Sequence, residues 1–149
     1  MDIQPVDPTL ISPDAIRTLE RHMLEMPQVD LQTQQLVHGG MYARTIFIPA
    51  GTCLTGAETA LDNICIVMGD ISVTTDKGMV RLQGYNVLPA GHGVKRVGLS
   101  HADTWWTTLW ATDKTDLQEI EDQVVTESNM LQTRREGITF EERPALREH

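Results

Sequence analysis

The feature that most constrains the fold is a series of short strand-like segments between Leu31 and Thr112. Val, Ile and Thr are enriched in these segments, and Gly or Pro interrupts them every several residues. Many short strands separated by turns are typical of a β-sandwich or a β-barrel. The sequence therefore predicts an all-β core, an antiparallel barrel or jelly roll over residues 31–112.

A tight hairpin is predicted at the centre of this region. The apolar segment Asn63–Met68 is followed by Gly69-Asp70 and then by the alternating segment Ile71–Thr74. Two strand segments separated by two turn-forming residues predict a hairpin. Further turns are expected at residues 76–78 and at Gly84, each followed by another strand.

The last strand-like segment, residues 104–110, carries tryptophan on both of its faces. Successive side chains of a strand point to opposite sides. One face must fill the barrel, so the other face needs a cover, either a terminal helix of this chain or another subunit. The first face holds Trp106, Thr108 and Trp110, and the second holds Trp105, Thr107 and Leu109.

A helix is predicted before the strand region. Ser12 before Pro13 is typical of an N-cap followed by the first helical position, and Pro27 is expected to stop the helix. Ile11 is spaced to form a hydrophobic staple with Ile16. The apolar residues at helical spacing are Ile16, Leu19, Met23 and Met26.

A second helix is predicted after the strands. Thr115 and Gln118 form a potential capping box. Leu117, Ile120 and Val124 supply a narrow apolar stripe. The sequence thus predicts one domain over residues 1–149: an N-terminal arm and helix (1–30), the barrel (31–112), a helix (113–125) and an extended C-terminal tail (126–149).

Composition excludes several partners. The net charge of −9 argues against binding of nucleic acid or an anionic membrane, because both need clustered Lys and Arg. We expect neither a recognisable secretion signal nor a membrane span, since no stretch approaches the ~20 apolar residues that a span needs. Cys53 and Cys65 lack zinc-site spacing and are expected to be reduced, buried thiols, which favours assembly in a cytoplasm.

An internal repeat points to a family of barrels. Ile48–Gly51 recurs as Leu88–Gly91, an apolar-Pro-Ala-Gly step that follows a strand both times. Gly51 and Gly69 match the two ends of the first cupin motif, and Pro89 with Gly91 matches the second, although Gly84 lies one residue closer than expected. The stretch from Ile48 to Gly98 therefore resembles the cupin superfamily.

The positions that bind metal in cupins hold other residues here. Ala57 and Thr59 occupy the two histidine slots of the first motif, and its acidic slot falls at or near Asp62. In the second motif Val94 occupies the histidine slot and Gly98 the asparagine slot. Ala, Thr and Val cannot replace imidazole donors. The resemblance thus implies a cupin scaffold with neither metal nor cofactor.

Residues 40–125 also look like small cupin-like proteins of tailed bacteriophages. This resemblance implies a non-enzymatic virion protein, a capsid cement or decoration protein or a head–tail accessory, assembled in the host cytoplasm. Barrel faces and terminal arms would bind capsid or tail proteins, and a homodimer or trimer is expected. The interface candidates are Trp105, Trp106, Trp110, Met23, Met26, Leu131 and Phe140.

Other functional classes stay open. A cupin isomerase or a metal-dependent oxygenase would need unconventional ligands, and a metal-free carbohydrate-binding barrel would need an exposed tryptophan ring. Lys95-Arg96 could hold an anionic ligand or form an intersubunit salt bridge. The candidates for a surrogate metal or general-base site are Glu58, Asp62, His92, His101 and Asp103, the last two sharing a face if their segment is a strand.

Overall fold

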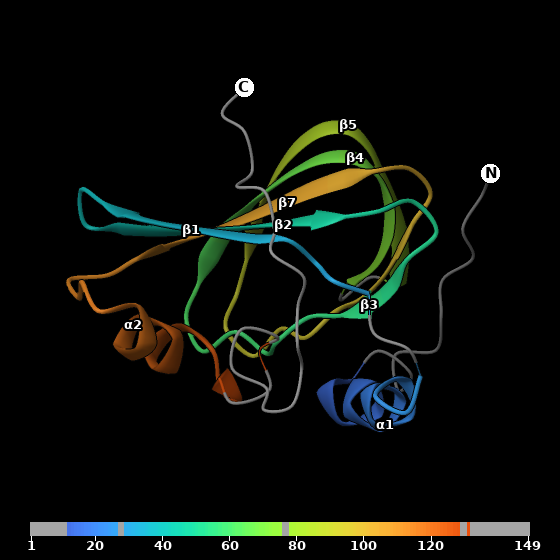
Figure 1. Cartoon of the computed structure of the whole chain (residues 1–149), viewed down its shortest axis with the longest axis horizontal. Helices are drawn as coiled ribbons and strands as arrows, with labels where there is room; N and C mark the ends of the chain where they lie inside the picture. Colours follow the sequence, from blue (N-terminus) through green and yellow to red (C-terminus); the bar gives the residue numbers. More distant parts are fainter. Residues whose placement is uncertain (1–11, 27–28, 76–77, 129–130, 132–149) are drawn as a thin grey trace.

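The computed structural model describes residues 12–26, 29–75, 78–128 and 131. In these residues seven antiparallel strands form one curled sheet, in the order β1-β2-β7-β4-β6-β3, with β5 paired to β4 (Figure 1). The predicted all-β core of antiparallel strands is confirmed. The strands are β1 (Thr33–His38), β2 (Met41–Ile48), β3 (Cys53–Thr55), β4 (Asn63–Thr75), β5 (Gly78–Ala90), β6 (Val97–Ser100) and β7 (Thr104–Ala111).

The predicted hairpin at Gly69-Asp70 and the predicted turn at Gly84 are both wrong. β4 continues through Gly69 and β5 continues through Gly84. The antiparallel pairing of Thr75 with Gly78 agrees with the turn expected at residues 76–78. Gly69 and Gly84 face each other in the ladder, with φ of +147° and +76°. Two glycines at facing positions bend the paired strands without ending them, because glycine tolerates positive φ inside a strand.

The bend allows β4 to serve both halves of the barrel. Before the bend, Ile64–Met68 pairs with β7, and after it, Ile71–Val73 pairs with β6. β4 and β5 arch together from one half to the other (Figure 1). A core cluster between the halves contains Ile48, Cys65, Val67, Ile71 and Val73.

Thr104 packs directly against the bend. Its side chain is fully buried, and its Oγ1 accepts a hydrogen bond from the Asp70 amide (3.1 Å) and donates to the Ala102 carbonyl (2.9 Å). A Cβ on Gly69 would collide with Thr104 Oγ1 and would lie 2.6 Å from the Asp103 carbonyl oxygen. Glycine is therefore required at position 69 both for its φ and for its lack of a side chain.

Helix α1 (Pro13–Met23) begins as predicted. Ser12 is the N-cap, and its Oγ accepts a hydrogen bond from the Ala15 amide (3.2 Å). The helix ends at Met23, before the predicted stop at Pro27, and Ile16 is its buried residue. Ile11, the expected staple partner, lies outside the described residues.

Helix α2 (Leu117–Val124) begins on a different cap from the predicted Thr115. Asp116 is the N-cap, and its Oδ1 accepts from the Glu119 amide (3.0 Å), because a carboxylate one residue later reaches the same first turn. Ile120 and Val124 are buried as predicted, whereas Leu117 is exposed. Neither helix in the described residues is long and apolar enough to span a membrane.

Alanine substitutions at Gly69 and Gly84 should distinguish the cost of backbone strain from the cost of a steric collision. An alanine at Gly84 would meet no atom within 4 Å, so Gly84→Ala should cost about 1–2 kcal/mol for its positive φ alone. Gly69→Ala adds the collision with Thr104 and should cost at least about 3 kcal/mol. Urea unfolding of both variants measures the two costs, and equal costs would show that Thr104 does not restrict the bend.

Candidate functional site

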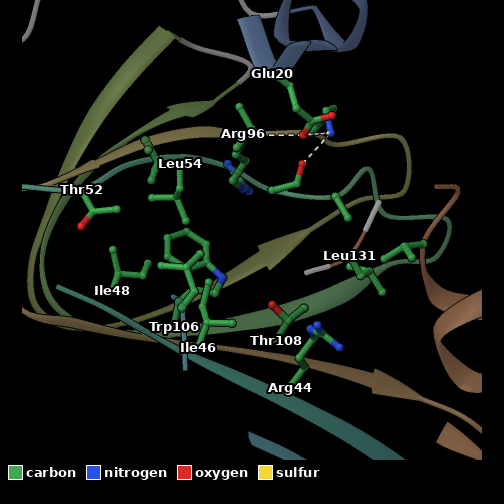
Figure 2. A pocket seen from close by; sticks show the side chains of 18 of the residues that line it. Glu20, Arg44, Ile46, Ile48, Thr52, Leu54, Arg96, Trp106, Thr108 and Leu131 are labelled. Atoms are coloured by element: carbon green, nitrogen blue, oxygen red, sulfur yellow. Dashed lines mark hydrogen bonds and ion pairs between the residues drawn. The ribbon is translucent and has the colours of Figure 1, made fainter. Parts of the chain in front are cut away.

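The curled sheet encloses a cavity of about 520 Å³ (Figure 2). Its walls are mainly apolar side chains that point inward from the strands, and this volume is in the range of small-molecule sites, roughly 300–1,000 Å³. Figure 2 shows Trp106 beside Ile46, with Ile48 and Leu54 on the same side of the cavity. Strand-derived wall residues include Ile46, Ile48, Leu54, Cys65, Ile71, Val73, Trp106, Thr108 and Trp110.

Helix α1 lies along the opening of the cavity, where Leu19 and Met23 form part of the wall. Glu20 Oε2 accepts hydrogen bonds from Lys95 Nζ (3.1 Å) and Thr55 Oγ1 (2.6 Å). Lys95 Nζ also donates to the Gly56 carbonyl (2.8 Å), and its side chain is only 1% exposed. Lys95 therefore anchors α1 within the chain, so its predicted role as an intersubunit or ligand-binding cation is wrong.

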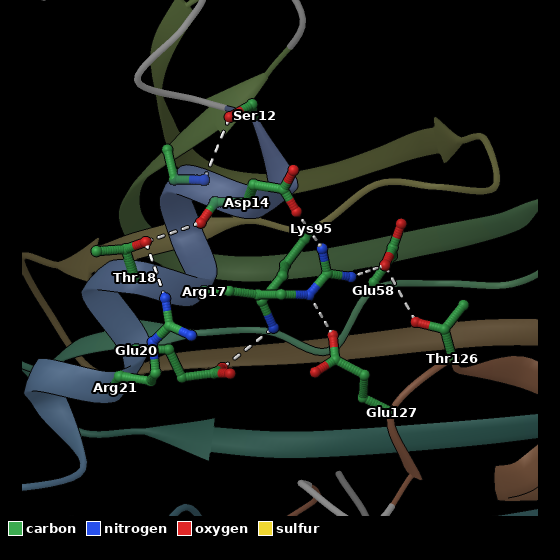
Figure 3. Close-up of polar contacts among 11 residues, drawn as sticks. Ser12, Asp14, Arg17, Thr18, Glu20, Arg21, Glu58, Lys95, Thr126 and Glu127 are labelled. Carbon is green, nitrogen blue, oxygen red and sulfur yellow. Dashed lines mark hydrogen bonds and ion pairs between the residues drawn. The ribbon is translucent and has the colours of Figure 1, made fainter.

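Arg17 is the second anchor of α1 (Figure 3). Its guanidinium contacts Glu58, and its Nε donates to Glu127 Oε1 (2.6 Å). The hydrogen bond with Glu127 is the main cause that raises the pKa of Arg17. Thr126 Oγ1 also donates to Glu58 (3.1 Å), so these contacts join α1 to the segment after α2.

Helix α2 closes the other end of the barrel. The rings of Tyr42 and Trp110 stack with centroids 5.5 Å apart and an interplanar angle of 17°, and they pack against Ile120 and Val124. Leu131, expected in an extended tail, packs against this cluster and lines the cavity. The Trp110 ring is 4% exposed, and its Nε1 has no hydrogen-bond partner in the described part of the chain.

Two arginines enter the cavity from different elements. Arg44 on β2 donates to Glu121 Oε2 of α2 (2.9 Å). Arg96, in the loop before β6, donates from Nη1 to the Thr74 carbonyl (2.9 Å). Figure 2 shows its guanidinium pointing toward the side of the cavity occupied by Trp106. Among the described residues no carboxylate forms an ion pair with Arg96.

The two cysteines occupy different environments. Cys65 is buried on the cavity wall, and burial raises the pKa of its thiol while the charge of Arg96 opposes the rise. Cys53 is exposed, which corrects the expectation that both thiols are buried. The reason is that Cys53 lies on β3, a short strand at the edge of the sheet.

The predicted surrogate metal ligands lie apart from one another. Glu58 is paired with Arg17, while Asp62 Oδ1 accepts from the His92 amide (2.9 Å) and lies 3.1 Å from His92 Nδ1. Asp62 and His92 are both exposed, and the hydrogen bond with His92 is the main cause that lowers the pKa of Asp62. Within the described ranges no three His, Cys, Asp or Glu side chains gather as metal ligands.

His101 and Asp103 do not form the predicted pair. His101 Nε2 hydrogen-bonds to Ser72 Oγ (2.7 Å), whereas Asp103 Oδ1 accepts from the Ala50 amide (3.0 Å). Residues 101–103 form a bend before β7, so the side-chain alternation of a strand does not apply to them. Both side chains hold the barrel framework together.

The cupin ligand slots contain no donor set for a metal. Ala57 and Val94 line the cavity, so two of the three histidine slots do face it. Thr59 Oγ1 instead donates to the Gly91 carbonyl (3.1 Å). These residues do not fit the metal of the cupin enzymes, because a methyl or isopropyl group offers no lone pair.

The outer surface of β1, β2, β7 and the parts of β4 and β5 that pair beside them carries no Asp, Glu, Lys or Arg, and we call it the outer face. It follows from the strand registers as the side opposite the cavity. Tyr85 is 67%, Met68 57% and Val87 54% exposed, while Trp105 packs against Phe47 with ring centroids 5.0 Å apart. The outer face comprises Gln34, Leu36, His38, Met41, Ala43, Thr45, Phe47, Ile64, Ile66, Met68, Tyr85, Val87, Pro89, Trp105, Thr107, Leu109 and Ala111.

The predicted interface residues lie in different places. Trp105 belongs to the outer face, whereas Trp106 and Trp110 line the cavity, as the alternation along β7 predicted. Met23 and Met26 line the cavity opening, and Met26 is exposed. Phe140 lies outside the described residues.

Sequence reasoning missed Arg44 as part of the cavity wall and Tyr42 as part of the cluster under α2. The signal was present, because Tyr42, Arg44 and Ile46 alternate with Ala43 and Thr45 along β2. An arginine on an otherwise apolar inward face is a marker of an internal polar contact. Here that contact is the ion pair with Glu121.

No protein-family model matches the chain, and no curated protein matches it in sequence. Several solved structures are similar in fold. One is a protein from Neisseria meningitidis, with 12% identity over 63% of this chain and 96% of that chain and a TM-score of 0.47. A cupin superfamily protein from Desulfitobacterium hafniense has 13% identity over 62% and 86%, with a TM-score of 0.47. KdgF from a Halomonas species has 17% identity over 59% and 87%, with a TM-score of 0.48.

Proposed function

We propose that this protein is a non-enzymatic binding protein whose metal-free barrel holds a small organic molecule. The observation that carries this proposal is the apolar cavity of about 520 Å³. Protein interiors are packed as densely as organic crystals and contain few voids larger than a water molecule. An apolar ligand would restore the dispersion contacts that the wall residues lack, and its binding would remove apolar surface from water.

The chemistry of the cavity walls supports binding rather than catalysis. Glu20 and Glu127, the carboxylates of the wall, are both in ion pairs. A general base has to be available to take a proton from a substrate. His101 and Asp103 are hydrogen-bonded to the framework and do not line the cavity. A carbohydrate fits less well than an apolar ligand, because sugar hydroxyls need many polar partners.

Two neighbouring threonines of β7 provide a test of this function. Thr108 lines the cavity, whereas Thr107 points to the outer face. Wild type should bind the neutral apolar probe N-phenyl-1-naphthylamine with increased fluorescence. Thr108→Trp fills the cavity and should weaken this binding at least about tenfold, a loss of about 1.4 kcal/mol. Thr107→Trp is the matched control and should bind like wild type. Equal binding by all three proteins would place the probe outside the cavity and overturn the proposal.

We also propose that the outer face joins two copies of the chain as a homodimer. Exposed apolar patches of this kind are typical of protein interfaces. The chain carries a net charge of −9, yet the outer face carries no Asp, Glu, Lys or Arg. A two-fold contact places the same face of both copies together. An uncharged face permits that contact without bringing like charges close.

A charge on the outer face should separate the copies. Val87 is 54% exposed, so Val87→Arg should leave the fold intact while placing two arginines in the two-fold contact. Sedimentation velocity should show a dimer for wild type and a monomer for this variant. Leu99→Arg, at an exposed apolar position on β6 away from the outer face, should remain dimeric. A monomeric wild type would refute the proposed dimer.

We further propose that the assembled barrel is a virion component, a capsid cement or decoration protein or a head–tail accessory. The resemblance of residues 40–125 to small cupin-like phage proteins supports this proposal, and the outer face would supply a surface for neighbouring subunits. Mass spectrometry of purified phage particles should detect the protein at a fixed stoichiometry. Particles formed without it should be more sensitive to heat and osmotic shock, and particles that behave like wild type would contradict this role.

A further inference from the structure

We infer that the cavity ligand is an amphipathic carboxylate, an anionic head on an apolar body, whose head is held by Arg96. This inference rests on the proposed ligand-binding function and specifies the chemistry of the same site. It combines three observations: the pairing of the cations in the wall, a buried N–H without an acceptor, and the apolar surroundings of Arg96.

The first observation concerns the cations of the cavity wall. Lys95 is neutralised by Glu20, and Arg44 by Glu121. Arg96 has no such partner in the described part of the chain and gives one hydrogen bond, to the Thr74 carbonyl. A guanidinium has five N–H donors in a fixed fork that matches a carboxylate. Arg96 therefore retains both charge and donors for a ligand anion.

The second observation concerns Trp110. Its ring lines the cavity and is 4% exposed, and its Nε1 has no acceptor among the residues that the structure describes. Indole nitrogen is a donor only, so an acceptor atom has to satisfy it. Because buried donors are rarely left unpaired, a ligand with an acceptor atom that reaches this N–H is favoured over a ligand that is apolar throughout. Arg96 and Trp110 both favour an oxygen-bearing ligand.

The third observation concerns what surrounds Arg96. Figure 2 shows its side chain pointing into the same space as Leu54, Ile48 and Trp106. These side chains offer a surface for a hydrocarbon chain or ring but no counterion. An unpaired charge is unfavourable in such surroundings, and a carboxylate whose apolar body lies on these side chains compensates it.

A matched pair of competitors tests this inference. Dodecanoate and dodecan-1-ol have the same chain length and differ in the head group. Each should displace N-phenyl-1-naphthylamine from wild type near neutral pH, dodecanoate at a concentration at least about tenfold lower, as expected for a charge-assisted hydrogen bond. Arg96→Gln should abolish the preference for dodecanoate over dodecan-1-ol, and Arg96→Lys should restore part of it. Arg81→Gln is the control, because Arg81 pairs with Asp70 and does not line the cavity.

The outcomes separate the inference from the function on which it rests. If wild type does not bind the probe, the proposed function fails. If wild type binds the probe but the alcohol displaces it as well as the carboxylate does, the inference about the head group is overturned while the function stands. If Arg96→Gln keeps the preference, Arg96 does not hold the carboxylate. If Arg96→Gln does not fold, Arg96→Met takes its place, and an unchanged preference in that variant would show that Arg96 does not hold the carboxylate.

Discussion

The contact between Gly69 and Thr104 is the constraint on which the barrel depends. Because Gly69 has no side chain, β7 begins directly against the bend of β4. There Thr104 Oγ1 accepts a hydrogen bond from the Asp70 amide. Asp70 is also held by Arg81 of β5 through two hydrogen bonds, of 2.8 and 2.7 Å, and these lower the pKa of its carboxyl. Because the bend is fixed in this way, β4 pairs with β7 before the bend and with β6 after it. The cavity forms between the two halves of the barrel that β4 connects.

The two ends of the cavity are closed by different physical means. Helix α2 packs Ile120 and Val124 on stacked aromatic rings, so that end depends mainly on apolar burial. Helix α1 buries fewer apolar side chains and is held by the ion pairs of Arg17 and Glu20. The salt bridges of α1 span segments far apart in the sequence, which makes the opening sensitive to substitutions in any of them.

The sequence was informative where one periodic pattern decided the structure. Alternation along residues 104–110 correctly separated Trp105 from Trp106, and Ser12-Pro13 correctly began α1. The sequence-based prediction failed at Gly69 and Gly84, because a glycine is equally compatible with a turn that ends a strand and with a bend inside a strand. Only the pairing of Gly69 with Gly84 across the β4–β5 ladder shows that they are bends. The prediction also failed for candidate site residues whose hydrogen-bond partners lie far away in the sequence. His101 and Asp103 are close in sequence, but their partners Ser72 and Ala50 come from other segments.

Strand β7 shows a consequence of building a thin barrel with two working surfaces. Trp105 and Thr107 belong to the outer face, while Trp106 and Thr108 belong to the cavity wall. If the proposed ligand lies inside the barrel and the proposed second copy lies against it, adjacent residues of this strand would be subject to different selection. The tolerated substitutions would then change along the strand with a period of two, and the ligand and the partner could diverge independently on one backbone.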